Sequence, residues 1–133
     1  MTFPTVAASS TYASSANETG ATVTLPSGVV EGSKLSMFVF KDGFNNFSAE
    51  PAGWKLKFSA TSQSGIGRVH IYEIVAGASE SNPAFTFASD SICAIIVRWS
   101  NAGDMIYGAP DYSFGAKTPT PRTAYAEEWS GDD

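Results

Sequence analysis

The sequence predicts an all-β fold, an antiparallel β-sandwich of about seven or eight strands, of the jelly-roll or immunoglobulin-like type. Short runs rich in Val, Ile, Phe, Tyr and Thr recur along the chain, and Gly, Pro, Asn and Ser separate them. No window places apolar residues at the i, i+3, i+4 and i+7 positions of an amphipathic helix. The connections between the runs are too short for helical crossovers, so neighbouring strands should pair antiparallel.

The first predicted strands differ in how apolar they are. Residues 4–14 are rich in Ser and Ala and should form a weak edge strand. Residues 21–25 alternate apolar and polar side chains, and this strand should stop at the turn formed by residues 26–28. Residues 35–40 are apolar on both faces, which predicts a central strand that ends in a tight Asp-Gly turn at residues 42–43.

The clearest alternation follows the Pro-Ala-Gly turn at residues 51–53. Trp54, Leu56 and Phe58 should share the core face, whereas the lysines and the serine between them should face solvent. This two-residue period is typical of a strand with one wet face, and it makes the three apolar side chains part of the predicted core.

Residues 68–75 form the next predicted strand, with Val69 and Ile71 on one face and His70 and Tyr72 on the other. His70 is the one histidine of the chain, and it has no second His or Cys partner for a zinc site of ordinary type. We interpret it as a histidine on the wet face of its strand, or one held by a hydrogen bond.

The last predicted strands are the alternating run at residues 85–87 and the very apolar run at residues 92–99, which should be buried on both sides. Cys93 lies in the second run and is the one cysteine, so no disulfide can form within the chain. We expect Cys93 to be a small, inert core residue, because no positive charge lies near it to favour the thiolate.

The chain divides into a predicted sandwich domain over residues 1–102 and an extended arm over residues 103–133. The arm loses the strand alternation and is rich in Pro and Gly. We expect it to dock on a neighbouring subunit; folding back on its own sandwich, or disorder, are the alternatives. Its candidate contact residues are isolated aromatics that could each enter a pocket on a partner: Tyr107, Tyr112, Phe114, Tyr125 and Trp129.

A second candidate contact surface is the loop at residues 43–48, which carries Phe44 and Phe47. A polar loop rarely holds two Phe side chains, and we expect both rings to pack on the core end or on another subunit. The alternative is a glycan platform, on which a sugar stacks and the neighbouring asparagines donate hydrogen bonds.

The composition bounds the function classes. Hydrophobic residues make up 43% of the 133 residues and charged residues only 16%, below the roughly 25% of an average soluble domain. A protein with so few charged residues is expected to have part of its surface covered by another molecule, although surface Ser and Thr could also keep the protein soluble. The net charge is −5 and the basic residues are scattered, so nucleic-acid binding is not expected. No run is apolar enough for a membrane span, and no secretion signal is recognised, so we expect synthesis in the cytoplasm.

No motif for catalysis or for a cofactor appears. No Gly-x-Ser-x-Gly elbow surrounds a serine, and Gly65 and Gly67 lack the Gly-Lys-Ser/Thr that a phosphate-binding loop requires. Two alternatives are a pair of carboxylates for glycoside hydrolysis and a calcium site near Asp42 and Glu50. The spacing of acidic residues along the sequence does not give the distances between their carboxylates, so it supports neither. The sequence therefore predicts no catalytic residue, no metal and no cofactor, and we do not expect an enzyme.

The order of these segments resembles a β-sandwich domain that recurs in structural proteins of tailed bacteriophages. A Val-Thr-Leu-Pro strand leads into a very apolar strand, then a Pro-Ala-Gly-Trp turn, a strand that contains Tyr and closes on Ala, and a last strand that ends in Arg. The likeness covers about residues 4–102. Longer domains of this phage type continue with further strands at the place where this chain has residues 103–133. The segments that carry the resemblance are residues 23–28, 31–40, 51–56, 69–76 and 95–102.

The resemblance implies a virion component made in the host cytoplasm, with the major capsid protein or other virion subunits as partners and no catalytic residues. The function expected first is that of a capsid decoration, or cement, protein that binds the assembled phage head and stabilises it. A receptor- or glycan-binding module of a fibre or tail is the alternative. Head or tail location and homo-oligomerisation stay open.

Overall fold

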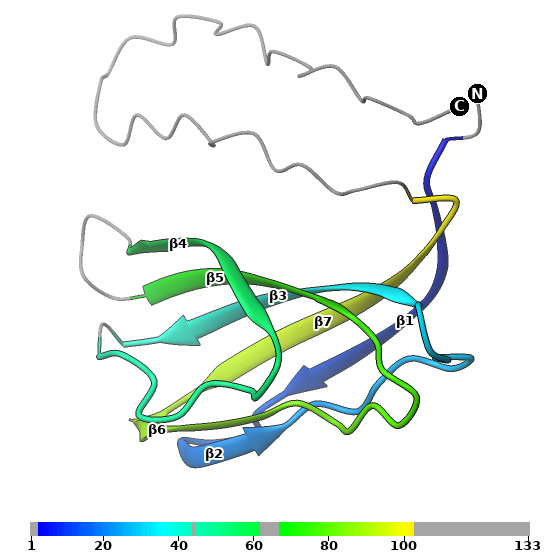
Figure 1. Ribbon diagram of the computed structural model, residues 1–133. Helices are drawn as coiled ribbons and strands as arrows, with labels where there is room; N and C mark the ends of the chain where they lie inside the picture. The colour runs from blue at the N-terminus through cyan, green and yellow to red at the C-terminus, as the bar shows by residue number, and fades with distance from the viewer. Residues whose placement is uncertain (1–2, 44, 62–66, 103–133) are drawn as a thin grey trace, which may run out of the picture.

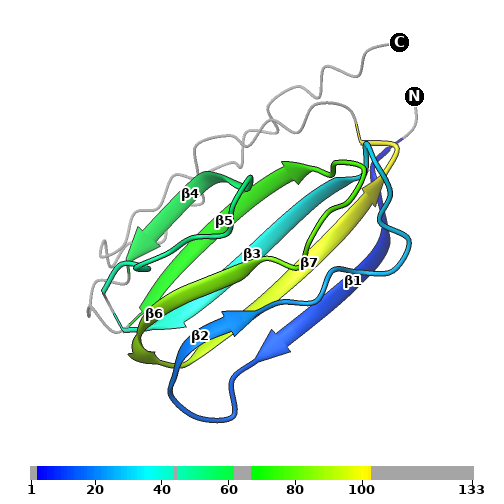
Figure 2. The same ribbon diagram turned by 60° about the horizontal axis from the view of Figure 1, so that its bottom comes forward.

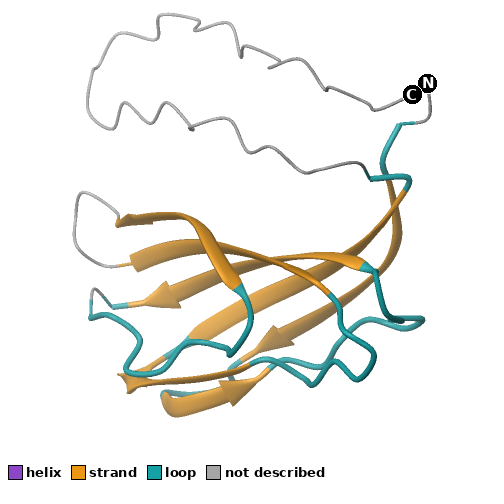
Figure 3. Cartoon of the chain, in the orientation of Figure 1, coloured by secondary structure: helices purple, strands orange, loops and turns teal. Residues whose placement is uncertain are grey.

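The computed structural model describes residues 3–43, 45–61 and 67–102, and this part of the chain contains strands but no helix (Figure 3). None of it forms a helix long and apolar enough to span a membrane. The strands, in chain order, are β1 (Thr5–Ala13), β2 (Glu18–Thr22), β3 (Lys34–Asp42), β4 (Lys55–Thr61), β5 (Gly67–Val75), β6 (Ala84–Asp90) and β7 (Ile92–Ser100).

The strands form two antiparallel sheets that lie one above the other (Figures 1 and 2). The larger sheet has five strands in the order β1-β7-β3-β5-β4, and the smaller one pairs β2 with β6. Every pairing within the two sheets is antiparallel. The prediction of an all-β antiparallel sandwich is confirmed, and the predicted arm at residues 103–133 lies outside the described residues.

The position of each strand in the larger sheet follows its composition. β3 is the apolar run predicted to be central, and it pairs with β5 on one side and with β7 on the other. The Ser- and Ala-rich β1 lies at the edge, as predicted, and its register shifts between Val6 and Ala8. Such an irregularity makes an edge strand a poorer template for pairing with another chain.

The core fills the space between the two sheets. The larger sheet contributes alternate side chains of β3, β5 and β7, and the smaller sheet contributes alternate side chains of β2 and β6. The loop residue Trp54 is also buried, as predicted. The strand side chains of this core are Ala21, Leu35, Met37, Val39, Tyr72, Phe85, Phe87, Ile92, Ala94 and Ile96.

Two strands differ from their predicted course. β2 ends at Thr22 because the backbone beyond it bonds to a loop: the Val23 N–H donates to the Pro83 carbonyl at 2.9 Å. In β4 the register with β5 shifts between Leu56 and Phe58, so these side chains do not share one face as predicted. Leu56 is 45% exposed at the sheet edge and does not belong to the buried core.

Truncation of Val23 should test the packing between the sheets. Val23 is fully buried, whereas Val30 lies in a turn and is 66% exposed. We expect Val23→Ala to lower the free energy of unfolding by about 1.5–3 kcal/mol, because two buried methyl groups are lost and a cavity remains. Val30→Ala, the matched control, should change it by less than about 0.5 kcal/mol. Urea unfolding followed by tryptophan fluorescence measures both, and equal losses would contradict this core.

Candidate functional site

The outer face of the five-stranded sheet is the side turned away from β2 and β6 (Figures 1 and 2). No described segment crosses it in either view. The side chains on it alternate with the core side chains of the same strands, and the register places those of β3 beside those of β5 and β7. The central ones are all apolar: Phe38, Phe40, Val69, Ile71, Cys93 and Ile95.

This outer face is both apolar and accessible. Phe40 is 49% exposed, and Val69 and Ile95, which lie on the strands at either side of it, are each 36% exposed. Single exposed apolar residues are ordinary on a protein surface, but a contiguous group of them marks an interaction site. The outer face is therefore the candidate binding surface of the described chain.

Two local contacts hold side chains of the outer face in place. Gly67 leaves room for the Phe40 ring, since a Cβ at this position would lie 2.8 Å from the Phe40 Cζ atom. The Trp99 Nε1–H donates to the Ser36 hydroxyl at 2.9 Å, which gives the fully buried hydroxyl group of β3 a partner. The surface is thus held by the sheet before any partner arrives, which lowers the entropic cost of binding.

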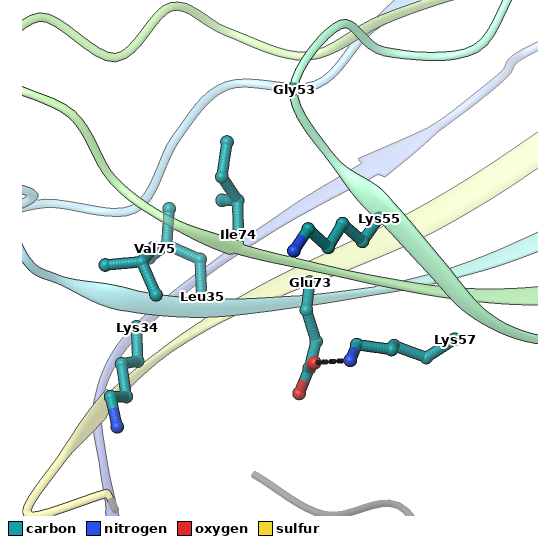
Figure 4. Close-up of a pocket in the computed structure, with 8 residues that line it drawn as sticks. All are labelled: Lys34, Leu35, Gly53, Lys55, Lys57, Glu73, Ile74 and Val75. Atoms are coloured by element: carbon teal, nitrogen blue, oxygen red, sulfur yellow. Dashed lines mark ion pairs between the residues drawn. The ribbon is translucent and has the colours of Figure 1, made fainter. Parts of the chain in front are cut away.

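A basic depression lies at the end of the larger sheet where β3 begins and β5 ends, and its lining includes Leu35 and Ile74 of the inner side (Figure 4). It has a volume of about 460 Å³. Three of its lining residues are the lysines Lys34, Lys55 and Lys57, and one is Glu73, which pairs with Lys57 at 3.2 Å. In the close-up the Lys34 and Glu73 side chains point away from the core residue Ile74. Lys57 is paired with Glu73, and the added positive charge of Lys55 favours an acidic group on whatever covers this end.

A buried ion pair joins the end of β3 to the end of β6. The Lys41 Nζ atom is fully buried and lies 2.6 Å from the Asp90 Oδ2 atom. It also donates to the Asp42 and Gly43 carbonyls at 3.4 and 3.3 Å. Gly43 has φ 91°, and a Cβ there would lie 2.4 Å from the Asp90 Oδ1 atom, so this turn requires glycine.

His70 lies between the two sheets and not on a wet face, which corrects the prediction from the sequence. It is 4% exposed, and its ring contacts Phe47 at 5.0 Å and Tyr72 at 5.9 Å between centroids. Burial lowers the His70 pKa; the Glu50 carboxylate opposes this effect, and Arg68 and Lys41 add to it. The Nδ1 atom has no hydrogen-bond partner within the described residues. A neutral imidazole enclosed in this way packs the core and is not open to a substrate.

Tyr72, beside His70, is a second polar group held in the core. Its hydroxyl donates to the Glu50 Oε1 atom at 2.7 Å. Burial, together with this hydrogen bond, raises the Tyr72 pKa far above its usual range. In the described part of the chain, no three His, Cys, Asp or Glu side chains lie together as a metal site would require.

Phe47 packs on aromatic side chains of the core. Its ring is half-buried and packs on Phe85 and Phe87 with centroid distances of 4.8 and 5.9 Å, in addition to His70. This is the packing on the core end that was expected from the sequence. The other candidate contact residues lie outside the described residues: Phe44, Tyr107, Tyr112, Phe114, Tyr125 and Trp129.

Cys93 is exposed, so the prediction of a buried core cysteine was wrong. β7 is apolar on both faces, but only its inner side is covered by the smaller sheet. Ile96 is fully buried on the inner side, whereas Cys93 and Ile95 face outward beside Phe40 and Phe38. The apolar sequence on both sides of β3 and β7 was the signal of this site; it was interpreted as a central strand for β3 and as burial on both sides for β7.

Comparison with known proteins gives no further guide to this surface. No family model, curated protein or solved structure matches the chain. The resemblance to phage virion domains therefore stays a hypothesis based on sequence segments, and function has to be argued from the outer face and its basic depression.

Removal of the Asp90 carboxylate should destabilise the fold strongly. Asp90→Asn leaves the fully buried Lys41 ammonium without its counter-ion, and we expect a loss of about 3 kcal/mol or more. Asp42→Asn, the same change at the neighbouring exposed acid, should cost less than about 0.5 kcal/mol. Urea midpoints measure both. The double variant Lys41→Met/Asp90→Asn should lose less than the sum of its parts, and strict additivity would contradict the pairing.

The buried His70 should make stability fall in mild acid. Its pKa is lower in the folded than in the unfolded chain, so the unfolded chain binds more protons as the pH drops below about 6.5. The stabilisation is therefore present above the unfolded pKa and is lost as the pH falls toward the folded pKa. Urea unfolding at pH 7.5, 6.5 and 5.5 should show this loss in the wild type and a smaller loss in His70→Phe. Parallel curves for the two proteins would show that His70 titrates normally.

Proposed function

We propose that this chain is a virion structural protein, a capsid decoration protein that binds the assembled phage head and stabilises it, with the major capsid protein or other virion subunits as its partner. The observation that supports this most is the open, apolar outer face, with Phe40 49% exposed on its central strand. A protein that works by attachment needs such a face, because burial of apolar area is the main source of affinity.

Enzymatic activity is not part of this proposal. The chain has one histidine, and that imidazole lies between aromatic rings in the core, where it cannot act as a base toward a bound substrate. The apolar outer face carries Cys93 as its only thiol. These groups support a passive role, in which shape and apolar area do the work.

The physical mechanism is linkage between binding and assembly. A ligand that binds only the assembled shell stabilises it by RT ln(1 + [L]/Kd), about 2.7 kcal/mol per site at a hundredfold excess over Kd. Many sites on one shell add their contributions. The low fraction of charged residues, 16%, is consistent with a surface that is partly covered in the working state.

Addition of the purified chain to expanded capsids should raise their melting temperature. The capsids are assembled from the major capsid protein whose gene lies nearest to the gene of this chain, and melting is followed by calorimetry. Phe40→Lys puts a charge on the central strand of the outer face and should abolish the increase, because a buried, unpaired charge is costly. Val30→Lys, at a turn residue that is 66% exposed, should leave it unchanged.

Two results would contradict the proposal in different ways. Capsids that melt at the same temperature with saturating wild-type protein would exclude decoration of that shell. An increase that Phe40→Lys and Val30→Lys retain equally would keep the function but remove the outer face as its binding surface. Both variants are first compared with the wild type in urea unfolding, so that loss of folding is not mistaken for loss of binding.

A further inference from the structure

No described segment covers the apolar outer face. β3 and β7 are apolar on both sides, and the smaller sheet covers only their inner side. An apolar face that stays in water costs solubility and invites association between copies. Any occupant has to match two features at once: apolar side chains across the middle and lysines at one end.

The sequence of residues 103–133 has both complementary features. Aromatic side chains are spaced along it, and no regular alternation commits them to a sheet of their own. It contains six acidic and two basic residues, so it holds −4 of the chain's net charge of −5. Four of these acids lie close to the end of the chain: Glu127, Glu128, Asp132 and Asp133.

The place where this segment begins also fits. In the register of β3 with β7, Trp99 lies beside Lys34, so β7 ends at the same end of the sheet as the basic depression. A nine-residue strand such as β7 is about 30 Å long. Residues 103–126 can span up to about 80 Å when extended, which allows the chain to cross the outer face and return. This length is sufficient for the acids after residue 126 to reach the lysines at the end of the sheet where β7 stops.

We propose that residues 103–133 cover the outer face of their own chain, with their aromatic side chains on Phe38, Phe40 and Ile95 and their acidic end at Lys55 and Lys57. The connection through residues 101–102 makes this contact intramolecular, with an effective concentration in the millimolar range for a short link. A second copy must reach the same face from solution, where it is usually far more dilute. The segment on its own chain is therefore the favoured occupant.

This inference concerns the isolated chain and does not depend on the phage head as partner. Should a shell bind the outer face, the segment competes with it, and the apparent affinity falls by the fraction of chains in which the face is open. Covering the face in this way also keeps free copies from associating through it. The lysines and acids that close the contact make it weaker at high salt.

Cys93 gives a direct test, because the one thiol of the full-length chain lies on the outer face. It is labelled with a maleimide that carries a small diazirine, and a mixture of ¹⁴N- and ¹⁵N-labelled protein is irradiated at micromolar concentration. Mass spectrometry then identifies the cross-linked peptides. We expect most cross-links to join Cys93 to residues 103–133 of the same isotopic chain.

Two outcomes overturn the proposal. Cross-links that join the two isotopes in the proportion of random pairing would identify a second copy as the occupant. Labelled Cys93 that reacts only with solvent or with neighbouring strands would show that residues 103–133 do not lie there. Neither outcome bears on the capsid melting experiment, so this inference and the proposed function can fail separately.

The rate of Cys93 alkylation tests the charge complementarity in the full-length chain. Wild-type Cys93 should react with iodoacetamide at least tenfold more slowly than in the urea-unfolded chain. Glu127→Lys/Glu128→Lys should raise the rate several-fold, and adding Lys55→Glu/Lys57→Glu should restore part of the protection. The control Glu31→Lys, at an exposed turn, should leave the rate unchanged. Equal rates in the wild type and in the Glu127→Lys/Glu128→Lys variant would exclude the acidic end from the contact.

Discussion

The pairing of β3 with β5 on one side and β7 on the other is the interaction on which the rest of the structure depends. Both ladders run almost the whole length of β3, so its backbone groups find partners inside the sheet. The same register gathers Leu35, Met37 and Val39 on the inner face and Phe38 and Phe40 on the outer face. The central strand is thus apolar on both sides, and the sheet formed by β2 and β6 covers its inner side.

Polar groups in the core fix how β6 and the loop after β3 pack on the larger sheet. Lys41 and Asp90 join the ends of β3 and β6, and the Tyr72 hydroxyl holds Glu50 of the connection that follows β3. Buried polar groups of this kind contribute little net stability when paired, but they cost several kcal/mol when a partner is removed. They therefore fix the position of the loop that carries Phe47 over the core.

The candidate site could be located from the sequence only in part. The runs at residues 35–40 and 92–99 were recognised as apolar on both sides, which is the property that creates the outer face. For residues 92–99 the pattern led to a prediction of burial on both sides, because a sequence cannot show how many strands are available to cover a sheet. Cys93 was misplaced for this reason. The basic depression joins lysines from β3 and β4, and only the strand order brings them together.

The sequence by itself determined that the chain is an all-β protein, that residues 35–40 are central, that residues 4–14 are an edge, and that Gly43 makes a turn. These features depend on local period, composition and turn chemistry. The tertiary structure decided which side of each strand faces the core. Alternation separates His70 from Val69 but does not say which is inside, and a one-residue bulge beside Lys57 sends Phe58 to the opposite face from Leu56. Pairing with distant strands decides which side of β5 faces the core and on which face Phe58 lies, because a shift of one residue in register exchanges the two faces of a strand.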